Sequence, residues 1–305
     1  MPFDFDAVST PFRMQPGLRR LTPGATQLTP THIGDAHLRE KLAVLTQHAG
    51  QALLSAPSFD ARPALLALCE QATRDADAFT VDAHGVHSAP RLGWSLHGDE
   101  PIGDGPSEIG ARLRALPAAW RLPALLSLAF AEDFAVIDGA TGRIPWLAVC
   151  LPSHWSPEEK VGRHFAEVHA PVADNQTLIT ASDHLAQLVT GTDRWERFVW
   201  TVTPRSALDN HPARCGPTQW DADSTPWFRT EHQTFIPVPE HRQAVFTIHV
   251  EVQPLAQVID SAERARRLHD AIASMSPAVL AYRSLSVPRE RLLAWLARRA
   301  TAADA

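Results

Sequence analysis

The sequence predicts an α+β fold in which an antiparallel sheet is flanked by helices. Strand-like segments are concentrated in the middle of the 305 residues, and amphipathic helical patterns precede and follow them. A chain of this length can bury a substantial core. We expect three regions: an N-terminal arm and helical region over 1–130, a core over 131–255, and C-terminal helices over 256–305 packed on the core.

The first region is expected to begin as an irregular arm. Residues 1–34 are rich in Pro, Thr and Gly, which disfavour long regular elements. Asp35 predicts the start of a helix over 36–55, and Asp60 predicts the start of a second helix. The remaining helices expected in this region cover 107–116 and 119–130.

The core is expected to contain five strands, with helices between the second and the third. The Asp-Gly pair in DGATGR predicts a hairpin between the first two strands. The strands are expected over 133–137, 144–151, 197–203, 228–236 and 244–252, and later helices over 176–190, 261–275 and 288–299.

One segment, LPSHWSPEEKVGRHFAEVHAPVADN (151–175), combines helix start and stop signals. Ser156 is a favourable N-cap, Pro157 suits the first helical position, and Glu159 completes a capping box. Pro171 disfavours helix at the residue before it, so the helix should end near His169.

Helical spacing predicts an open face around His169. Counting back by three, four and seven residues gives Ala166, Phe165 and Gly162 on one face. One imidazole, one aromatic ring and two very small residues leave room for a flat ligand such as haem. His164, about 140° around the helix, is expected to face solvent. Spacing alone favours a half-buried histidine bonded to a nearby carbonyl and does not establish a ligand.

The run LPSHW…EEKVGRHFAEVHAPV resembles the haem-dependent oxidative N-demethylase alpha-subunit family. Further pieces of the family pattern occur in order along most of the chain. They are PFRMQPGL, AEDFAVI, RFVWTV, FRTEHQTF, AVFTIHVEVQPL and MSPAVLAYRSL with LLAWL. Two strands, then helices, then three strands is also the chain order of a PAS domain, so the resemblance implies a PAS-like antiparallel sheet.

The resemblance implies that this domain binds haem b, with His169 as the axial ligand of the iron and Phe165 and Gly162 beside the porphyrin. It implies oxidation of dimethylamine by dioxygen, with electrons relayed from NADPH by separate flavin and iron–sulfur reductase subunits. Lys160 and Arg163 are candidates for contacts to the haem propionates, and simple solvated charges fit them equally well.

The strand over 228–236 predicts the substrate site. Alternation places Arg229, Glu231 and Gln233 on one face, and in this fold one sheet face lines the ligand cavity. Arg229 and Glu231 match the family pattern, whereas His232 stands where an arginine is expected. We expect Glu231 and Arg229 to act in catalysis, with the Glu231 carboxylate holding a small protonated amine. The second candidates for that carboxylate are Glu251 and Asp133.

Composition limits the other functions. A formal net charge of −6 argues against nucleic acid. No apolar run is long enough to cross a bilayer, and the N-terminal residues do not form a signal peptide, so we expect a cytoplasmic protein without a membrane partner. Three separated cysteines and the lack of a dinucleotide motif predict no iron–sulfur, flavin or nicotinamide site in this chain. Reducing equivalents must therefore come from a partner reductase.

Two points stay open at this stage. A haem-based gas or redox sensor without turnover, or a binding protein without the cofactor, is the alternative to an enzyme, although no output module follows residue 255. The arginine-rich C-terminal segment, including Arg266 and Arg267, is a candidate docking surface for an acidic electron donor.

Overall fold

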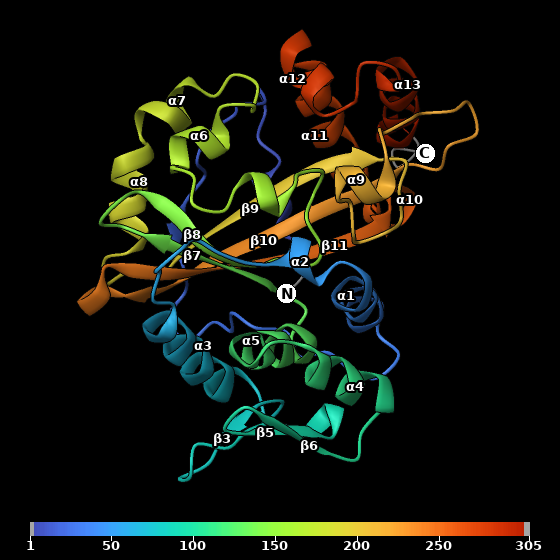
Figure 1. Cartoon of the computed structure of the whole chain (residues 1–305). Coiled ribbons are helices and arrows are strands. Elements are labelled where there is room, and N and C mark those ends of the chain that lie inside the picture. The colour runs from blue at the N-terminus through green and yellow to red at the C-terminus, as the bar shows by residue number, and fades with distance from the viewer. Residues whose placement is uncertain (1–2, 302–305) are drawn as a thin grey trace.

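A seven-stranded antiparallel sheet forms the centre of the computed structural model, which describes residues 3–301 (Figure 1). The strands, in spatial order, are β1 (Arg19–Arg20), β9 (Trp195–Thr203), β10 (Trp227–Val238), β11 (Gln243–Pro254), β7 (Asp133–Asp138), β8 (Arg143–Ala148) and β2 (Leu53–Ser55). The five strands expected in the core are all present, and the DGATGR hairpin joins β7 to β8. The α+β prediction is confirmed.

The register of the central strands defines the two faces of this sheet. Glu231 of β10 lies opposite Val199 of β9 and Val250 of β11, so these three side chains share a face. We call it the site face. It also carries Arg229 and Gln233, because side chains two residues apart on a strand point the same way.

The N-terminal region forms helices and a second, four-stranded sheet. Figure 1 shows α3, α5 and this small sheet on one side of the large sheet, with α6, α7 and α8 on the other. The elements are α1 (Ala36–Gln47), α2 (Ala49–Ala52), α3 (Arg62–Asp75), β3 (Thr80–Val81), β4 (His87–Ala89), β5 (Trp94–His97), β6 (Glu100–Gly103), α4 (Ser107–Ala115) and α5 (Ala118–Ala129).

The helix expected over 36–55 is shorter than predicted. It ends at Gln47, and after the single turn of α2 the chain becomes strand β2, in which Leu53 pairs with Ala148 of β8. Backbone pairing with the open edge of β8 outweighs the local helical pattern there. The Asp35 carboxylate accepts from the His32 amide instead of capping the helix.

Three short helices connect β8 to β9 and cover the site face. They are α6 (Phe165–His169), α7 (Gln176–Thr180) and α8 (Ser182–Val189). Phe165 and Val168 pack with Ala135, Leu147 and Phe246 on this face. The single helix expected over 176–190 is divided at Ala181.

The C-terminal helices form a cluster with the N-terminal arm. Val8 is fully buried in this cluster, and Phe12 contacts the Trp200 ring edge-on. The helices are α9 (Pro212–Cys215), in the loop before β10, and α10 (Leu255–Val258), α11 (Ala262–Ala273), α12 (Pro277–Tyr282) and α13 (Arg289–Thr301). Within residues 3–301, no helix combines the length and hydropathy needed to cross a membrane.

Candidate functional site

The helix expected from Pro157 to His169 is interrupted. Pro157–Glu159 form one 3-10 turn, and Ser156 makes no side-chain cap. Gly162 then adopts a φ of +73°, a conformation that disfavours side chains with a Cβ, and its amide donates to the Ile144 carbonyl of β8. The chain is thus drawn onto the edge of β8, and α6 begins only at Phe165. The expectation that Gly162 shares a helical face with His169 is wrong.

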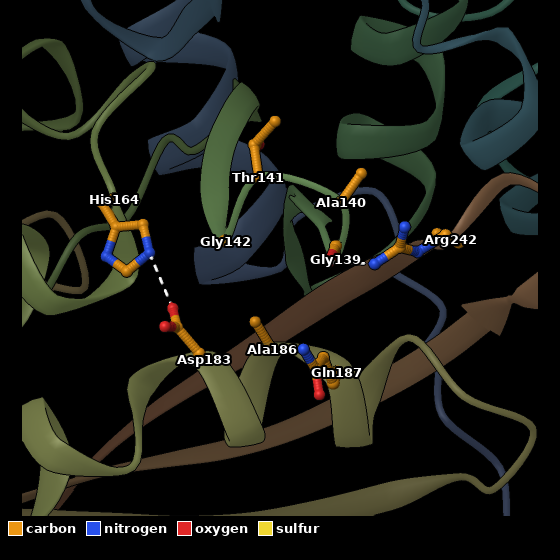
Figure 2. Close-up of a pocket in the computed structure, with 9 residues that line it drawn as sticks. All are labelled: Gly139, Ala140, Thr141, Gly142, His164, Asp183, Ala186, Gln187 and Arg242. Atoms are coloured by element: carbon orange, nitrogen blue, oxygen red, sulfur yellow. Dashed lines mark hydrogen bonds and ion pairs between the residues drawn. The ribbon is translucent and has the colours of Figure 1, made fainter.

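His164 begins α6 rather than facing solvent. Its Nδ1 accepts from the Ala166 amide at 3.2 Å, and the Glu167 carboxylate accepts from the His164 amide at 2.9 Å. The capping box therefore lies at His164 and Glu167, not at Ser156 and Glu159. The Nε2 of His164 also pairs with Asp183 of α8 at 3.0 Å (Figure 2).

His169 ends α6, as its position before Pro171 predicted. Its Nδ1 donates to the Phe165 carbonyl at 2.8 Å, because a carbonyl can only accept. This bond assigns the proton to Nδ1 and leaves the Nε2 lone pair available to a metal. Burial lowers the pKa of His169 to about 4, and the nearby charges of Arg197 and Lys160 act in the same direction. The imidazole is therefore neutral at physiological pH.

The other residues expected to bind the cofactor lie in different environments. The Phe165 ring is tilted against the His169 imidazole, with centroids 4.2 Å apart. Lys160 Nζ donates to the Val168 carbonyl at 3.0 Å, which places its charge at the C-terminal end of α6. The Arg163 side chain is exposed, and its carbonyl accepts from the Ile144 amide. Gly162 lies in the turn before α6.

Arg229 is buried, with 2% of its surface exposed, and it binds backbone. Its Nε donates to Ser153 Oγ at 2.9 Å, and its terminal nitrogens donate to the carbonyls of Ala207 at 3.1 Å and Leu208 at 2.7 Å. Longer contacts reach the carbonyls of Leu151 and Pro152. The guanidinium thus joins the loop after β8 to the loop after β9.

Glu231 is 8% exposed and lies between charged neighbours on the site face. Gln233 Nε2 donates to Glu231 Oε2 at 2.5 Å, and no described residue donates to Oε1. The two other carboxylates considered for this role are placed differently. Glu251 lies opposite Thr230 and hence on the other face, and Asp133 accepts from the Leu151 amide and pairs with the buried Lys41 amine.

A further charged residue of the site face, Arg197, was not predicted from the sequence. On β9, Arg197 lies opposite Gln233 and therefore diagonal to Glu231, whose direct partner is Val199. Its Nε is inaccessible to solvent and has no hydrogen-bond partner among residues 3–301. Burial lowers the pKa of Arg197, and the charge of Glu231 opposes that effect. Alternation within RFVWTV could have placed Arg197 on this face, but only if the pairing with β10 had been known.

A cavity of about 340 Å³ lies between the β7–β8 turn and α8 (Figure 2). It is lined by the β7–β8 turn, by His164 and Asp183, and by Arg242 after β10. A Cβ on Gly142 would lie 2.5 Å from His164 Nε2, so glycine is required for this close approach. The cavity therefore adjoins the cap of α6 rather than the free nitrogen of His169.

These features define an α+β protein in which a neutral histidine with one free ring nitrogen lies near a charged sheet face. A family model described as haem-dependent oxidative N-demethylase, alpha subunit-like, matches residues 119–293, more than half of the chain. The chain belongs to this family. The match covers His169, Arg197 and Glu231. The description indicates haem dependence, oxidative N-demethylation and assembly with another kind of subunit.

Proposed function

We propose that this chain binds haem b through His169 Nε2 and catalyses oxidative N-demethylation of a small secondary amine such as dimethylamine. The observation that carries the proposal is the hydrogen bond from His169 Nδ1 to the Phe165 carbonyl, because it fixes the tautomer that a haem iron requires. The sheet with its covering helices serves as a PAS-like cofactor domain within the proposed core over 131–255.

The residues near His169 fit a flat apolar group with charged edges. Phe165 and Val168 supply an apolar surface between α6 and the sheet. Lys160, at the end of α6, is positioned for a propionate, whereas the exposed Arg163 would meet one only at the solvent edge. When bound, haem supplies the iron that activates dioxygen and accepts electrons from the substrate.

Glu231 is the proposed binding residue for the protonated amine. Its Oε1 has no donor among the described residues, and Gln233 holds Oε2. An ammonium that carries two N–H groups would supply the missing donor and a compensating charge. Arg229 is proposed as a positioning residue. Its guanidinium donates to Ser153 in the loop after β8 and to Leu208 in the loop after β9, so it holds these two loops together.

The electrons are proposed to come from a separate reductase that carries flavin and iron–sulfur centres and oxidises NADPH. The family description as an alpha subunit supports a partner of another kind. A cytoplasmic location, which remains our expectation, agrees with NADPH as the primary reductant.

The direct test is an absorption spectrum of purified wild-type and His169→Ala protein. We expect a Soret band in the wild type that is lost or strongly shifted in the variant, and partly restored by free imidazole. His184→Ala, an exposed histidine of α8, is the matched control. An unchanged Soret band in His169→Ala would reject the assignment of the ligand.

Turnover needs a separate measurement. With dimethylamine, dioxygen and a reductase supplied with NADPH, we expect one formaldehyde per amine consumed. A protein that binds haem and dioxygen but forms no formaldehyde with any secondary amine would instead be a sensor.

A further inference from the structure

Strand β9 presents a row of hydrogen-bond donors on the site face that the protein itself does not satisfy. Trp195 Nε1, Arg197 Nε and Thr201 Oγ1 are inaccessible to solvent and have no partner among residues 3–301. The three residues are separated by even numbers of positions, and they pair with Phe235, Gln233 and Arg229 of β10. They therefore all point to the side of the sheet that α6 to α8 cover.

Arg197 is the charged member of this row. Its guanidinium forms no ion pair or hydrogen bond with the described residues, and the side-chain amide of Gln233, directly opposite, donates to Glu231. The residue as a whole is half-buried, but its Nε has lost its hydration without gaining an acceptor among the described residues, which is unfavourable. Such a group in a folded protein is normally satisfied by a bound acceptor.

Two neighbouring arginines have acceptors that Arg197 lacks. Arg229, on the same face, donates to a serine hydroxyl and to the carbonyls of Ala207 and Leu208. Arg194, in the turn before β9, donates to the Gln27 side chain. The protein supplies acceptors to these two arginines, whereas Arg197 has none among residues 3–301. Away from the site face, Arg112 Nε is also buried without a described partner.

The chemistry of the missing partner follows from the row itself. An indole N–H and a guanidinium can only donate, and a hydroxyl can donate as well. A ligand must therefore bring acceptors, and it must bring negative charge for Arg197. A carboxylate meets both needs and matches the two-pronged geometry of a guanidinium. The row lies on the sheet face that is covered by α6, the helix that carries the proposed iron ligand.

We infer that Arg197, with Trp195 two residues before it and Thr201 four residues after it on the same face, binds a carboxylate on the site face. The inference rests on the proposed function, which supplies two sources for this group. One is a haem propionate, and the other is the carboxylate of an N-methylated amino acid whose ammonium would bind Glu231.

The first arm of the test compares haem b with its dimethyl ester, in which both propionates are blocked. Apo-protein of the full chain is titrated with each porphyrin, and the dissociation constants are read from the Soret band. If a propionate binds Arg197, wild-type protein should bind haem b roughly 10- to 100-fold more tightly than the ester. Arg197→Met should remove this preference. Arg194→Met is the control, because it removes a positive charge from the turn before β9 and not from the row, and it should retain the preference.

The second arm tests the substrate as the source. Holoprotein is titrated with dimethylamine and with N,N-dimethylglycine, again by the Soret band. If the substrate supplies the carboxylate, the wild type should prefer dimethylglycine by at least tenfold, and Arg197→Met should bind the two amines equally. Because Arg197 has no partner among residues 3–301, the Arg197→Met apo-protein should melt at or above the wild-type temperature. If Arg197→Met does not fold, Arg197→Lys is used instead. It keeps the positive charge but cannot donate two parallel hydrogen bonds, so it should prefer dimethylglycine less strongly than the wild type does.

The outcomes separate the two proposals. Wild-type protein that binds haem but prefers neither the free propionates nor the carboxylated amine overturns the carboxylate site and leaves the proposed function standing. Wild-type protein that binds neither porphyrin overturns the proposed function, and this inference with it.

Discussion

Among single residues, His169 is distinguished by which of its two ring nitrogens is occupied. The bond from Nδ1 to the carbonyl four residues earlier is available only because Phe165 and His169 belong to the same helical turn. Burial and two nearby cations keep the ring neutral. A protonated imidazole cannot bind iron, so this environment preserves the ligand form at physiological pH.

The role of Glu231 is tested by removing its charge. Glu231→Gln should raise the KM for dimethylamine roughly 10- to 100-fold, because a charge-assisted hydrogen bond is replaced by a neutral one. Steady-state formaldehyde formation and amine titrations measure the effect, and haem content should stay unchanged. Glu251→Gln, on the opposite face of the sheet, is the control and should behave as wild type. Equal amine affinity in the two variants would remove Glu231 from the site.

A pH-dependent contribution to stability is expected from Glu132. Burial raises the pKa of its carboxyl to about 7, against an ordinary value of 4.5. The folded state therefore binds the proton more tightly than the unfolded state. The stabilisation is fully present below about pH 4.5 and is lost as the pH rises through 7. Wild-type Tm should fall between pH 5 and pH 8 relative to Glu132→Gln, and parallel Tm curves for the two proteins would contradict the assignment.

Among the elements, α6 shows most clearly how local sequence signals can mislead. Ser156, Pro157 and Glu159 form a favourable helix start, yet only one 3-10 turn follows them. Propensity describes a segment in isolation, whereas the edge of β8 offers backbone partners to residues 162–164. Gly162 can take the left-handed conformation that this requires. The end of the helix was predicted correctly because Pro171 acts locally.

The cap of α6 should influence haem affinity. His164→Ala removes the acceptor for the Ala166 amide and the pair with Asp183, which should cost about 1 kcal/mol and raise the haem Kd roughly 5-fold. His164→Asn, which keeps a capping acceptor, should lie between wild type and His164→Ala. Glu159→Ala is the control, since this exposed side chain caps nothing in the structure. Haem titration measures all three, and an effect of Glu159→Ala equal to that of His164→Ala would refute the observed cap.

In the molecule as a whole, the large sheet joins segments that are distant in sequence. It takes β1 and β2 from residues before 130, so the expected boundary at 130/131 falls between strands of one sheet. Buried Lys41 of α1 pairs with Asp133 at the start of β7. The division into three regions remains a proposal. It describes the order of segments along the chain, and it does not divide the molecule into independently folding units.

The N-terminal arm should depend on Arg267. Its Nε donates to the Val8 carbonyl at 2.8 Å and its terminal nitrogens bind Asp6. Arg267→Glu should release the arm by charge repulsion, lower the Tm and expose the arm to proteases. Limited proteolysis with mass spectrometry measures this, and Arg298→Glu, an exposed position on α13, is the control. Equal cleavage of the two variants would show that this contact does not hold the arm.

The same contacts bear on the docking surface expected in the C-terminal segment. Arg267 is engaged by the arm, and Arg266 donates to the Ala300 carbonyl. Reversing the charge of either residue would break these contacts. Slower electron delivery in such a variant could then result from a disturbed fold as readily as from weaker docking of the electron donor. Exposed Arg298 is a cleaner position at which to test docking.

The sequence by itself determined the chain order of the five central strands, the end of α6 at His169 and the alternation that puts Arg229 and Glu231 on one face. These features depend on residues close together in the chain, where spacing and proline have direct effects. Tertiary structure alone decided that Gly162 leaves the helix, that His164 caps it, that Arg229 binds backbone and that Arg197 lies unpaired beside Glu231. The reason is physical: each of these depends on which backbone groups and charges are brought near from another strand, and strand register brings together residues that no local pattern relates.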